Sequence, residues 1–316
     1  MKKVLKAITL FILLGANLLA NQPEWFLNIS KPNTIIGYGQ SKNRREAISF
    51  AREEIINTLS VNVESKISAT TVVDSNGYKK HFKSYGKSSS KLTINDSVIL
   101  KSVNSDGIWY VAVGYNTLPT VDKLSALIKN GVPVKPSYLN LTKFGQQLKK
   151  ILNYNVKLDI FRKDNGWYIQ ANNDISSTVR LTDDDFLDLF AEKNYKAIEV
   201  PSILHDGECF NIKLKSNSKY KTLLSVEKDG KVGLLTANNL NNYFPSKNQY
   251  MVMNNSENKT IYEMIVLIES DVKIDVHQFE NVHETVLDNS NYKFAELVYF
   301  LNKYNYSSKI VKVRKK

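Results

Sequence analysis

The apolar positions between Thr34 and Leu59 predict a short strand followed by a long amphipathic helix. Apolar residues recur in the second part at spacings of three and four, which places them on one helix face. Ser41 and Asn43 are candidate N-caps, because their side chains can accept hydrogen bonds from free backbone N–H groups. The residues of the predicted apolar face are Ala47, Ile48, Ala51, Ile55 and Leu59.

Alternating and β-branched residues after this helix predict a series of strands. The pattern changes at Val61-Asn62-Val63, which we interpret as the switch from helix to strand. One helix and a run of hairpins predict an α+β domain over residues 21–117, with the helix laid across an antiparallel sheet. The expected strands span residues 61–74, 78–93, 94–103 and 108–115.

Prolines mark the next boundary. Pro119, Pro133 and Pro136 bracket a short helical pattern, so residues 118–136 are expected to form a helical linker. A middle α/β segment, residues 137–196, follows. Its pattern predicts a helix over residues 142–152, a hairpin around Lys163–Gly166 and a second helix that begins after Thr182.

Residues 197–316 are predicted to form a β-rich, sandwich-like domain. Phe210, Ile212 and Leu214 alternate with polar residues, as the residues of a half-buried strand do. A hairpin is expected around Lys228–Gly230. Further elements are predicted as a strand over residues 261–269, a helix over residues 292–303 and a final strand over residues 310–313.

The first twenty residues have the pattern of a secretory signal peptide. Lysines precede an apolar run, and Ala20 supplies a small residue before a cleavage point. The alternative is an uncleaved membrane anchor, but the apolar run is short for a span of ~20 residues. Asn21 follows the cleavage point, so the sequence has no lipidation cysteine there. We therefore expect an exported, periplasmic protein.

The formal net charge of +12 is concentrated near the two ends of the chain. The part between them is only mildly basic, which does not indicate a nucleic-acid-binding surface. The basic C-terminus is a candidate for peripheral contact with an anionic membrane. A solvated terminus is the alternative. The candidate membrane-contact residues are Lys312, Arg314, Lys315 and Lys316.

Two local motifs have both a chemical and a structural interpretation. Gly37-Tyr38-Gly39 lies between a strand and a helix, where phosphate-binding turns occur, but Lys42 replaces the third glycine. We therefore interpret the two glycines as a tight turn. Asp183, Asp184 and Asp185 resemble a metal-binding cluster, but they follow Thr182 and suit the positive end of a capped helix. We expect no metal or cofactor at either place.

Cys209 is the only cysteine, and His205 precedes it by four residues. This pair is the best candidate for a nucleophile and its base, but a reactive thiolate also needs a base or positive environment and an oxyanion site. We interpret Cys209 as a structural thiol. His81, His277 and His283 do not have zinc-site spacing, although the last two flank Phe279 and are a candidate metal pair. No catalytic residue is assigned.

Two parts of the chain resemble known families. The order P-E-W, I-I-G-Y-G-Q-S, A-I-S-F-A-R-E-E-I, V-N-V and W-Y-V-A-V-G-Y, over residues 23–116, resembles the LPP-20 lipoprotein family and is similar to the N-terminal domain of the flagellar protein FlgT. Residues 198–272, with H-D-G-E-C-F-N-I-K-L-K-S, L-L-S-V-E-K-D-G-K-V-G-L-L, Y-F-P and Y-E-M-I-V-L-I-E-S, resemble the domain of unknown function numbered four-three-eight-four. Both resemblances imply envelope-associated domains without a known catalytic residue.

These observations predict a non-enzymatic protein of the bacterial cell envelope. Its expected role is interaction or assembly with other envelope proteins at outer-membrane or flagellar structures. The alternative hypothesis is a periplasmic hydrolase or thiol enzyme that uses Cys209 and His205.

Overall fold

The chain has an α+β fold, as the sequence predicts. It divides into two compact units, Met1–Leu118 and Pro119–Lys316, which are called unit 1 and unit 2. The computed structural model describes residues 22–70, 97–129, 131, 133–245, 250–251, 259–280 and 291–315. Within these ranges, only the backbone is described for residues 60–70, 250 and 251.

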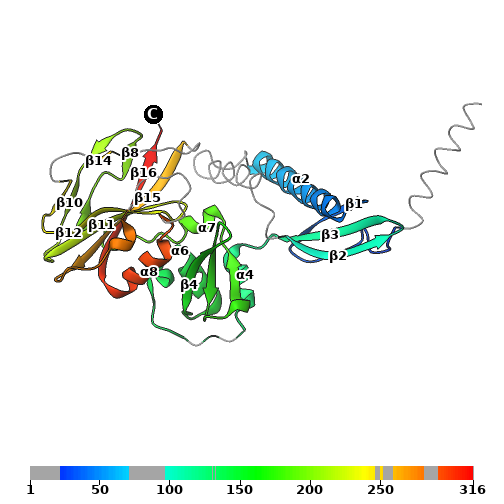
Figure 1. Cartoon of the computed structure of the whole chain (residues 1–316), viewed down its shortest axis with the longest axis horizontal. Helices are drawn as coiled ribbons and strands as arrows, with labels where there is room; N and C mark the ends of the chain where they lie inside the picture. The colour runs from blue at the N-terminus through cyan, green and yellow to red at the C-terminus, as the bar shows by residue number, and fades with distance from the viewer. Residues whose placement is uncertain are drawn as a thin grey trace, which may run out of the picture. The chain divides into compact units, whose positions relative to one another are not determined.

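Unit 1 contains a three-stranded antiparallel sheet in the order β1-β3-β2, and helix α2 runs beside these strands (Figure 1). Ala47, Ala51 and Ile55 of the helix are buried against Val111 and Val113 of the sheet, as the apolar spacing predicts. The elements are β1 (Thr34–Ser41), α2 (Arg44–Thr70), β2 (Val98–Ser105) and β3 (Ile108–Asn116).

Helix α2 is longer than the sequence pattern suggests. Residues 61–63 lie inside it, so the predicted switch to a strand at Val61 is wrong. Neither glycine nor proline interrupts this stretch, and the lower helix propensity of valine costs only roughly 0.5 kcal/mol relative to alanine. The expected strand over residues 78–93 lies outside the described residues.

The start of α2 uses both predicted capping residues. The side chain of Asn43 accepts a hydrogen bond from the backbone N–H of Arg45 at 2.8 Å. Ser41 accepts one from the backbone N–H of Asn43 at 3.1 Å, and its hydroxyl donates to Glu46 at 2.7 Å. These bonds satisfy backbone donors that a helix start leaves free.

Gly37 and Gly39 lie within β1 rather than in a turn, so the interpretation as a tight turn is wrong. Both glycines face α2. A Cβ atom on Gly37 would collide with the carbonyl oxygen of Ala51, and one on Gly39 would collide with the carbonyl oxygen of Ala47. The glycines therefore allow the backbones of strand and helix to approach closely.

The opposite face of this sheet is covered by the start of the described chain. Phe26 is buried and packs edge-on against Tyr38 and Tyr110, with ring centroids 5.4 and 5.1 Å apart. The backbone N–H of Ile29 also donates to the Tyr38 hydroxyl at 2.9 Å. The aromatic residues that follow Pro23 thus serve packing in unit 1.

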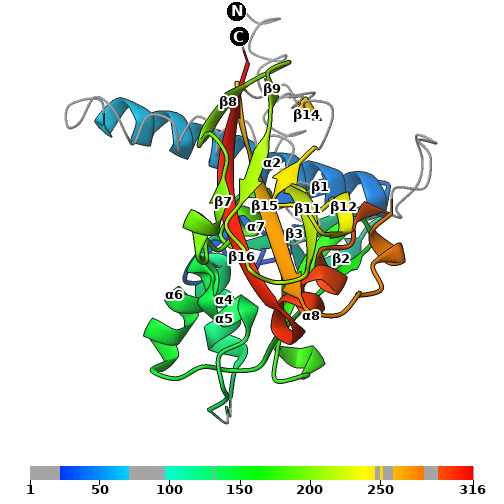
Figure 2. The ribbon, with the colours of Figure 1, turned by 90° about the vertical axis from the view of Figure 1, so that its left-hand side faces the viewer.

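Unit 2 is built on a five-stranded sheet in the order β12-β11-β15-β16-β8, and Figure 2 shows these strands side by side. All its strand pairs are antiparallel except β16 with β8. The strands are β8 (Ile203–His205), β11 (Tyr220–Glu227), β12 (Val232–Asn239), β15 (Thr260–Ser270) and β16 (Asn305–Arg314).

Two hydrophobic cores contact this sheet. The smaller core joins Leu223, Ile265 and Val311 of the sheet to Ile212 and Ile198 of a second, three-stranded sheet in the order β13-β10-β7. Two short strands pair separately as β14 and β9. The short strands are β7 (Ile198–Glu199), β9 (Cys209–Phe210), β10 (Ile212–Leu214), β13 (Tyr243–Phe244) and β14 (Tyr250–Met251).

The larger core joins segments that the sequence pattern separates. Leu124 from the expected linker and Phe144 from the expected middle segment share this core with Val266 and Phe294. Amphipathic helices bury their apolar faces together here, so linker and middle segment belong to unit 2. The helices are α4 (Thr120–Leu127), α5 (Tyr138–Leu141), α6 (Lys143–Leu152), α7 (Asp183–Leu187) and α8 (Phe294–Lys303).

A small antiparallel sheet in the order β4-β5-β6 completes this part of unit 2. Asp164 and Asn165 connect β4 to β5 with φ angles of 48° and 58°, as the predicted two-residue hairpin requires. Trp167 of β5 donates its indole N–H to the Asp229 carbonyl oxygen at 2.7 Å, which ties this hairpin to the β11–β12 turn. The remaining elements are β4 (Leu158–Lys163), β5 (Gly166–Ala171), β6 (Thr178–Arg180), η2 (Ile175–Ser177), η3 (Tyr195–Ala197) and η4 (His277–Phe279).

Candidate functional site

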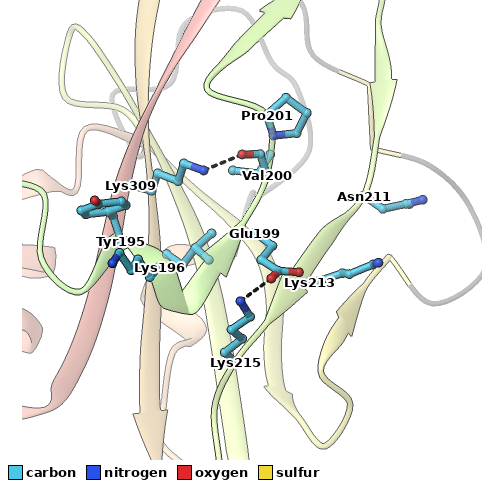
Figure 3. Close-up of a pocket in the computed structure, with 10 residues that line it drawn as sticks. Tyr195, Lys196, Glu199, Val200, Pro201, Asn211, Lys213, Lys215 and Lys309 are labelled. Atoms are coloured by element: carbon cyan, nitrogen blue, oxygen red, sulfur yellow. Dashed lines mark hydrogen bonds and ion pairs between the residues drawn. The ribbon is translucent and has the colours of Figure 1, made fainter.

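The candidate site begins with the pairing of two short strands, β7 and β10. Ile212 and Leu214 of β10 are buried in the smaller core, so the side chains that alternate with them face outward. These outward residues include Lys213 and Lys215. In the antiparallel register Lys213 lies opposite Glu199 of β7, and this arrangement places a carboxylate between two lysines (Figure 3).

A depression open to solvent surrounds this pair of strands, with a volume of about 580 Å³. Besides strands β7 and β10, it is lined by the turn before β7, by Pro201 and by a lysine of β16, as Figure 3 shows. It holds four lysines and one carboxylate, and we call it the lysine depression. Its lining residues are Tyr195, Lys196, Ile198, Glu199, Val200, Pro201, Asn211, Lys213, Lys215 and Lys309.

Glu199 is the acidic centre of the depression. Its carboxylate is 2.5 Å from the ammonium group of Lys215. The hydrogen bond and the charge of Lys215 lower the pKa of Glu199, and the charges of Lys213 and Lys309 lower it further. Glu199 is therefore ionised at neutral pH and compensates one of the surrounding positive charges.

The four lysines are not equivalent. Lys215 pairs with Glu199, and Lys309 donates to the Val200 carbonyl oxygen at 2.5 Å. Lys196 and Lys213 are exposed, and their side chains make no hydrogen bond or close ion pair with another residue of the described chain. Their ammonium groups are consequently the two most available to an incoming anion.

Cys209 and His205 lie on separate short strands, β9 and β8. The Cys209 thiol is exposed. The Nδ1 atom of the His205 ring is 3.3 Å from a carboxylate oxygen of Glu208, and the same carboxylate accepts the His205 backbone N–H at 2.7 Å. In the described residues no hydrogen bond joins His205 to Cys209.

This geometry predicts that His205 does not activate the thiol. Replacing His205 with alanine should change the rate of alkylation of Cys209 by less than about twofold, because the ring is engaged by Glu208. The measurement is iodoacetamide labelling followed by mass spectrometry, on folded protein across a pH series. A labelling rate that falls tenfold or more in this variant would support the thiol-enzyme alternative. Such a fall corresponds to an increase in the activation free energy on the order of 1.4 kcal/mol.

The three aspartates after Thr182 form the first turn of α7, and Asp185 takes part in capping it. The Asp185 carboxylate accepts hydrogen bonds from the Thr182 backbone N–H at 2.7 Å and from the Thr120 hydroxyl at 2.7 Å. The Thr182 hydroxyl accepts in return from the Asp185 backbone N–H. This reciprocal capping box matches the structural interpretation of the motif.

The remaining charged candidates are dispersed. His277 lies 3.1 Å from a Glu280 carboxylate oxygen, whose hydrogen bond and charge raise the pKa of the imidazole. His81 and His283 lie outside the described residues, and so does Lys316. Lys312 and Arg314 are exposed on β16. In the described residues no group of three or more His, Cys, Asp or Glu side chains is placed to hold a metal ion.

Sequence reasoning did not identify two features of unit 2. The first is the lysine depression, whose residues come from β7, β10, β16 and the turn before β7. The second is a pair of glutamates, Glu227 of β11 and Glu263 of β15, which lie directly opposite each other. Burial, together with the charge of Glu227, raises the pKa of Glu263 to about 7. The sequence gives a local signal for the lysine depression, because Lys213 and Lys215 alternate with the buried residues Ile212 and Leu214.

No known family model, curated protein or solved structure matches this chain. In the part of the chain that the structure describes, every helix is either too short or too polar to cross a membrane.

Proposed function

We propose that this chain is an exported, non-enzymatic protein of the bacterial cell envelope that acts in the periplasm by binding other envelope components. The signal-peptide pattern of residues 1–20 supports the export, with cleavage after Ala20. The resemblances of residues 23–116 and 198–272 to envelope-associated domains support an interaction or assembly role at outer-membrane or flagellar structures.

The observation that carries the binding role is the lysine depression. It is open and charged, and its four lysines outnumber its one carboxylate. Clustered charges of one sign steer a partner of the opposite sign and select against like-charged partners. A binding protein with an anionic partner fits this surface better than an enzyme that must enclose its substrate and exclude water.

Two measurements test this proposal. In the native host, the protein should be recovered from the periplasmic fraction with Asn21 as its first residue. The mature chain, crosslinked in envelope fractions, should yield a reproducible envelope partner whose recovery decreases as salt is raised. Recovery of the protein from the cytoplasm, or crosslinking that yields no envelope partner, would contradict the proposal.

A further inference from the structure

The lysine depression has the charge of a binding site for an anionic partner. Four lysines surround a single carboxylate, and Lys196 and Lys213 are not engaged by another described side chain in a hydrogen bond or close ion pair. Its volume of about 580 Å³ lies in the range of small-ligand sites, ≈ 300–1,000 Å³. We infer that this depression binds the phosphate-bearing headgroup of an anionic membrane lipid.

The cations that line the depression are able to bind phosphate. Every basic residue that lines the depression is a lysine, and none is an arginine. Lysine binds phosphate as a compact point charge with three donors, whereas the planar fork of arginine suits bidentate contacts with carboxylates and phosphates alike. Lys213 lies on the outer face of β10 and Lys196 lies in the turn before β7, and Figure 3 shows the two side chains on opposite sides of Glu199.

The rim of the depression favours a lipid over a free anion or an acidic protein. Tyr195 lines it and is 48% exposed, and Pro201, which also lines it, is exposed. Tyrosine is common at membrane–water interfaces, where its ring lies at the level of the headgroups. The inference rests on the proposed envelope function, because that location brings the protein close to a membrane.

Glu199 provides a test that does not depend on loss of folding. Its carboxylate repels an incoming phosphate and holds Lys215 in an ion pair at 2.5 Å. Replacing Glu199 with glutamine removes this repulsion and releases the Lys215 ammonium group. The Glu199→Gln variant should therefore bind anionic vesicles about fivefold more tightly, the effect of one unit charge near such a surface. The matched control is Glu296→Gln, which removes a glutamate from another surface lysine pair.

The experiment is co-sedimentation of the mature chain with vesicles of phosphatidylcholine, with and without phosphatidylglycerol, at low and high salt. Binding should require phosphatidylglycerol and weaken at high salt. The double variant Lys196→Gln/Lys213→Gln should bind more than tenfold less tightly, from about fivefold per charge removed. Lys149→Gln/Lys150→Gln removes two exposed lysines from α6 and should retain the parent's affinity.

Three results would overturn the inference: no binding to the anionic vesicles, equal loss in the two double variants, or loss only when Lys312, Arg314, Lys315 and Lys316 are replaced. A fourth would be binding of polyglutamate in preference to the vesicles. If vesicle binding fails while an envelope protein is still crosslinked, the lipid inference falls and the proposed function stands. If vesicles bind but no envelope protein is crosslinked, the assembly role falls instead.

Discussion

Replacing Gly39 with alanine is expected to destabilise unit 1 by about 3 kcal/mol or more, which is the upper end of the cost of overpacking. The new Cβ atom would meet the carbonyl oxygen of Ala47 and, at 2.7 Å, the backbone nitrogen of Ala51. Both obstacles are helix backbone, which cannot rotate away as a side chain can. The whole helix α2 would have to move away from β1, and the buried contacts of Ala47, Ala51 and Ile55 would open.

Gly114 provides the matched control, because it lies in β3 of the same sheet. A Cβ atom there would meet the Leu100 side chain at 2.9 Å and the methyl group of Thr34 at 3.1 Å. The Leu100 side chain can adjust by rotation, and alanine also reduces the entropy of the unfolded chain. Gly114→Ala should therefore change the stability of unit 1 by less than about 1 kcal/mol.

Hydrogen exchange of the full chain reports the protection of backbone amides in each unit separately, so it can compare the two variants. In Gly39→Ala, amides of β1, β3 and α2 should lose protection, while those of β15 and β16 in unit 2 should not change. Equal protection of the amides of unit 1 in Gly39→Ala and Gly114→Ala would show that α2 does not pack closely against the glycines of β1. Gly37→Ala should behave like Gly39→Ala, since its Cβ would collide with the Ala51 carbonyl oxygen.

The elements that the sequence predicted well are those set by local chemistry. The Asp164-Asn165 pair forces a two-residue turn with positive φ angles, and the hairpin follows directly. Thr182 and Asp185 likewise cap a helix through contacts that span only three residues. Alternation placed Ile212 and Leu214 inward without any knowledge of what covers them.

The errors arose where distant packing decides the outcome. Gly37 and Gly39 are typical of a turn when considered alone, but the α2 residues that they contact, eight or more positions later in the sequence, require them in a strand. At Val61 a weak local preference for strand was overridden by the helix that precedes it. The separation of linker, middle and C-terminal segments failed because their apolar faces are complementary, a property that no single segment reveals.

The lysine depression could not be predicted for the same reason. Lys309 donates to the carbonyl oxygen of Val200, which is 109 positions earlier in the sequence. Lys213 and Glu199 become neighbours only through the pairing of β10 with β7, two strands of three and two residues. Strands this short carry too little periodic signal to fix a register before the surrounding sheets are known.

The pair formed by Glu227 and Glu263 makes the stability of unit 2 depend on pH. Glu263 lies on β15 directly opposite Glu227 on β11. Burial is the main reason that the pKa of Glu263 is raised from 4.5 to about 7, and the negative charge of Glu227 contributes. Partial burial and the charge of Asp229 raise the pKa of Glu227 as well.

The direction of the pH effect follows from proton binding. Between about pH 4.5 and about pH 7 the folded chain keeps a proton on Glu263 that the unfolded chain has lost. The unfolded state binds fewer protons in this window, so the free energy of unfolding decreases as pH rises. This contribution is fully present below about pH 4.5 and is lost above about pH 7. A shift of this size corresponds to roughly 3 kcal/mol, at about 1.36 kcal/mol per pH unit.

Replacing Glu263 with glutamine should therefore stabilise unit 2 by as much as about 3 kcal/mol at about pH 8 and by much less at about pH 5. Glutamine is nearly isosteric and stays neutral, so it removes the cost of burying a charge. Urea denaturation followed by circular dichroism, in a series from about pH 5 to about pH 8, measures this difference. The parent's stability should fall across the series, and that of the variant should fall much less.

Glu227→Gln is the informative comparison, because it leaves Glu263 in place and removes the neighbouring negative charge. Burial still raises the pKa of Glu263 in this variant, but by less, so the fall in stability should persist and move to lower pH. A parent protein that is equally stable throughout the series would show that the Glu263 carboxyl reaches water in the folded chain. A Glu263→Gln variant with the parent's full pH dependence would assign the effect to other groups.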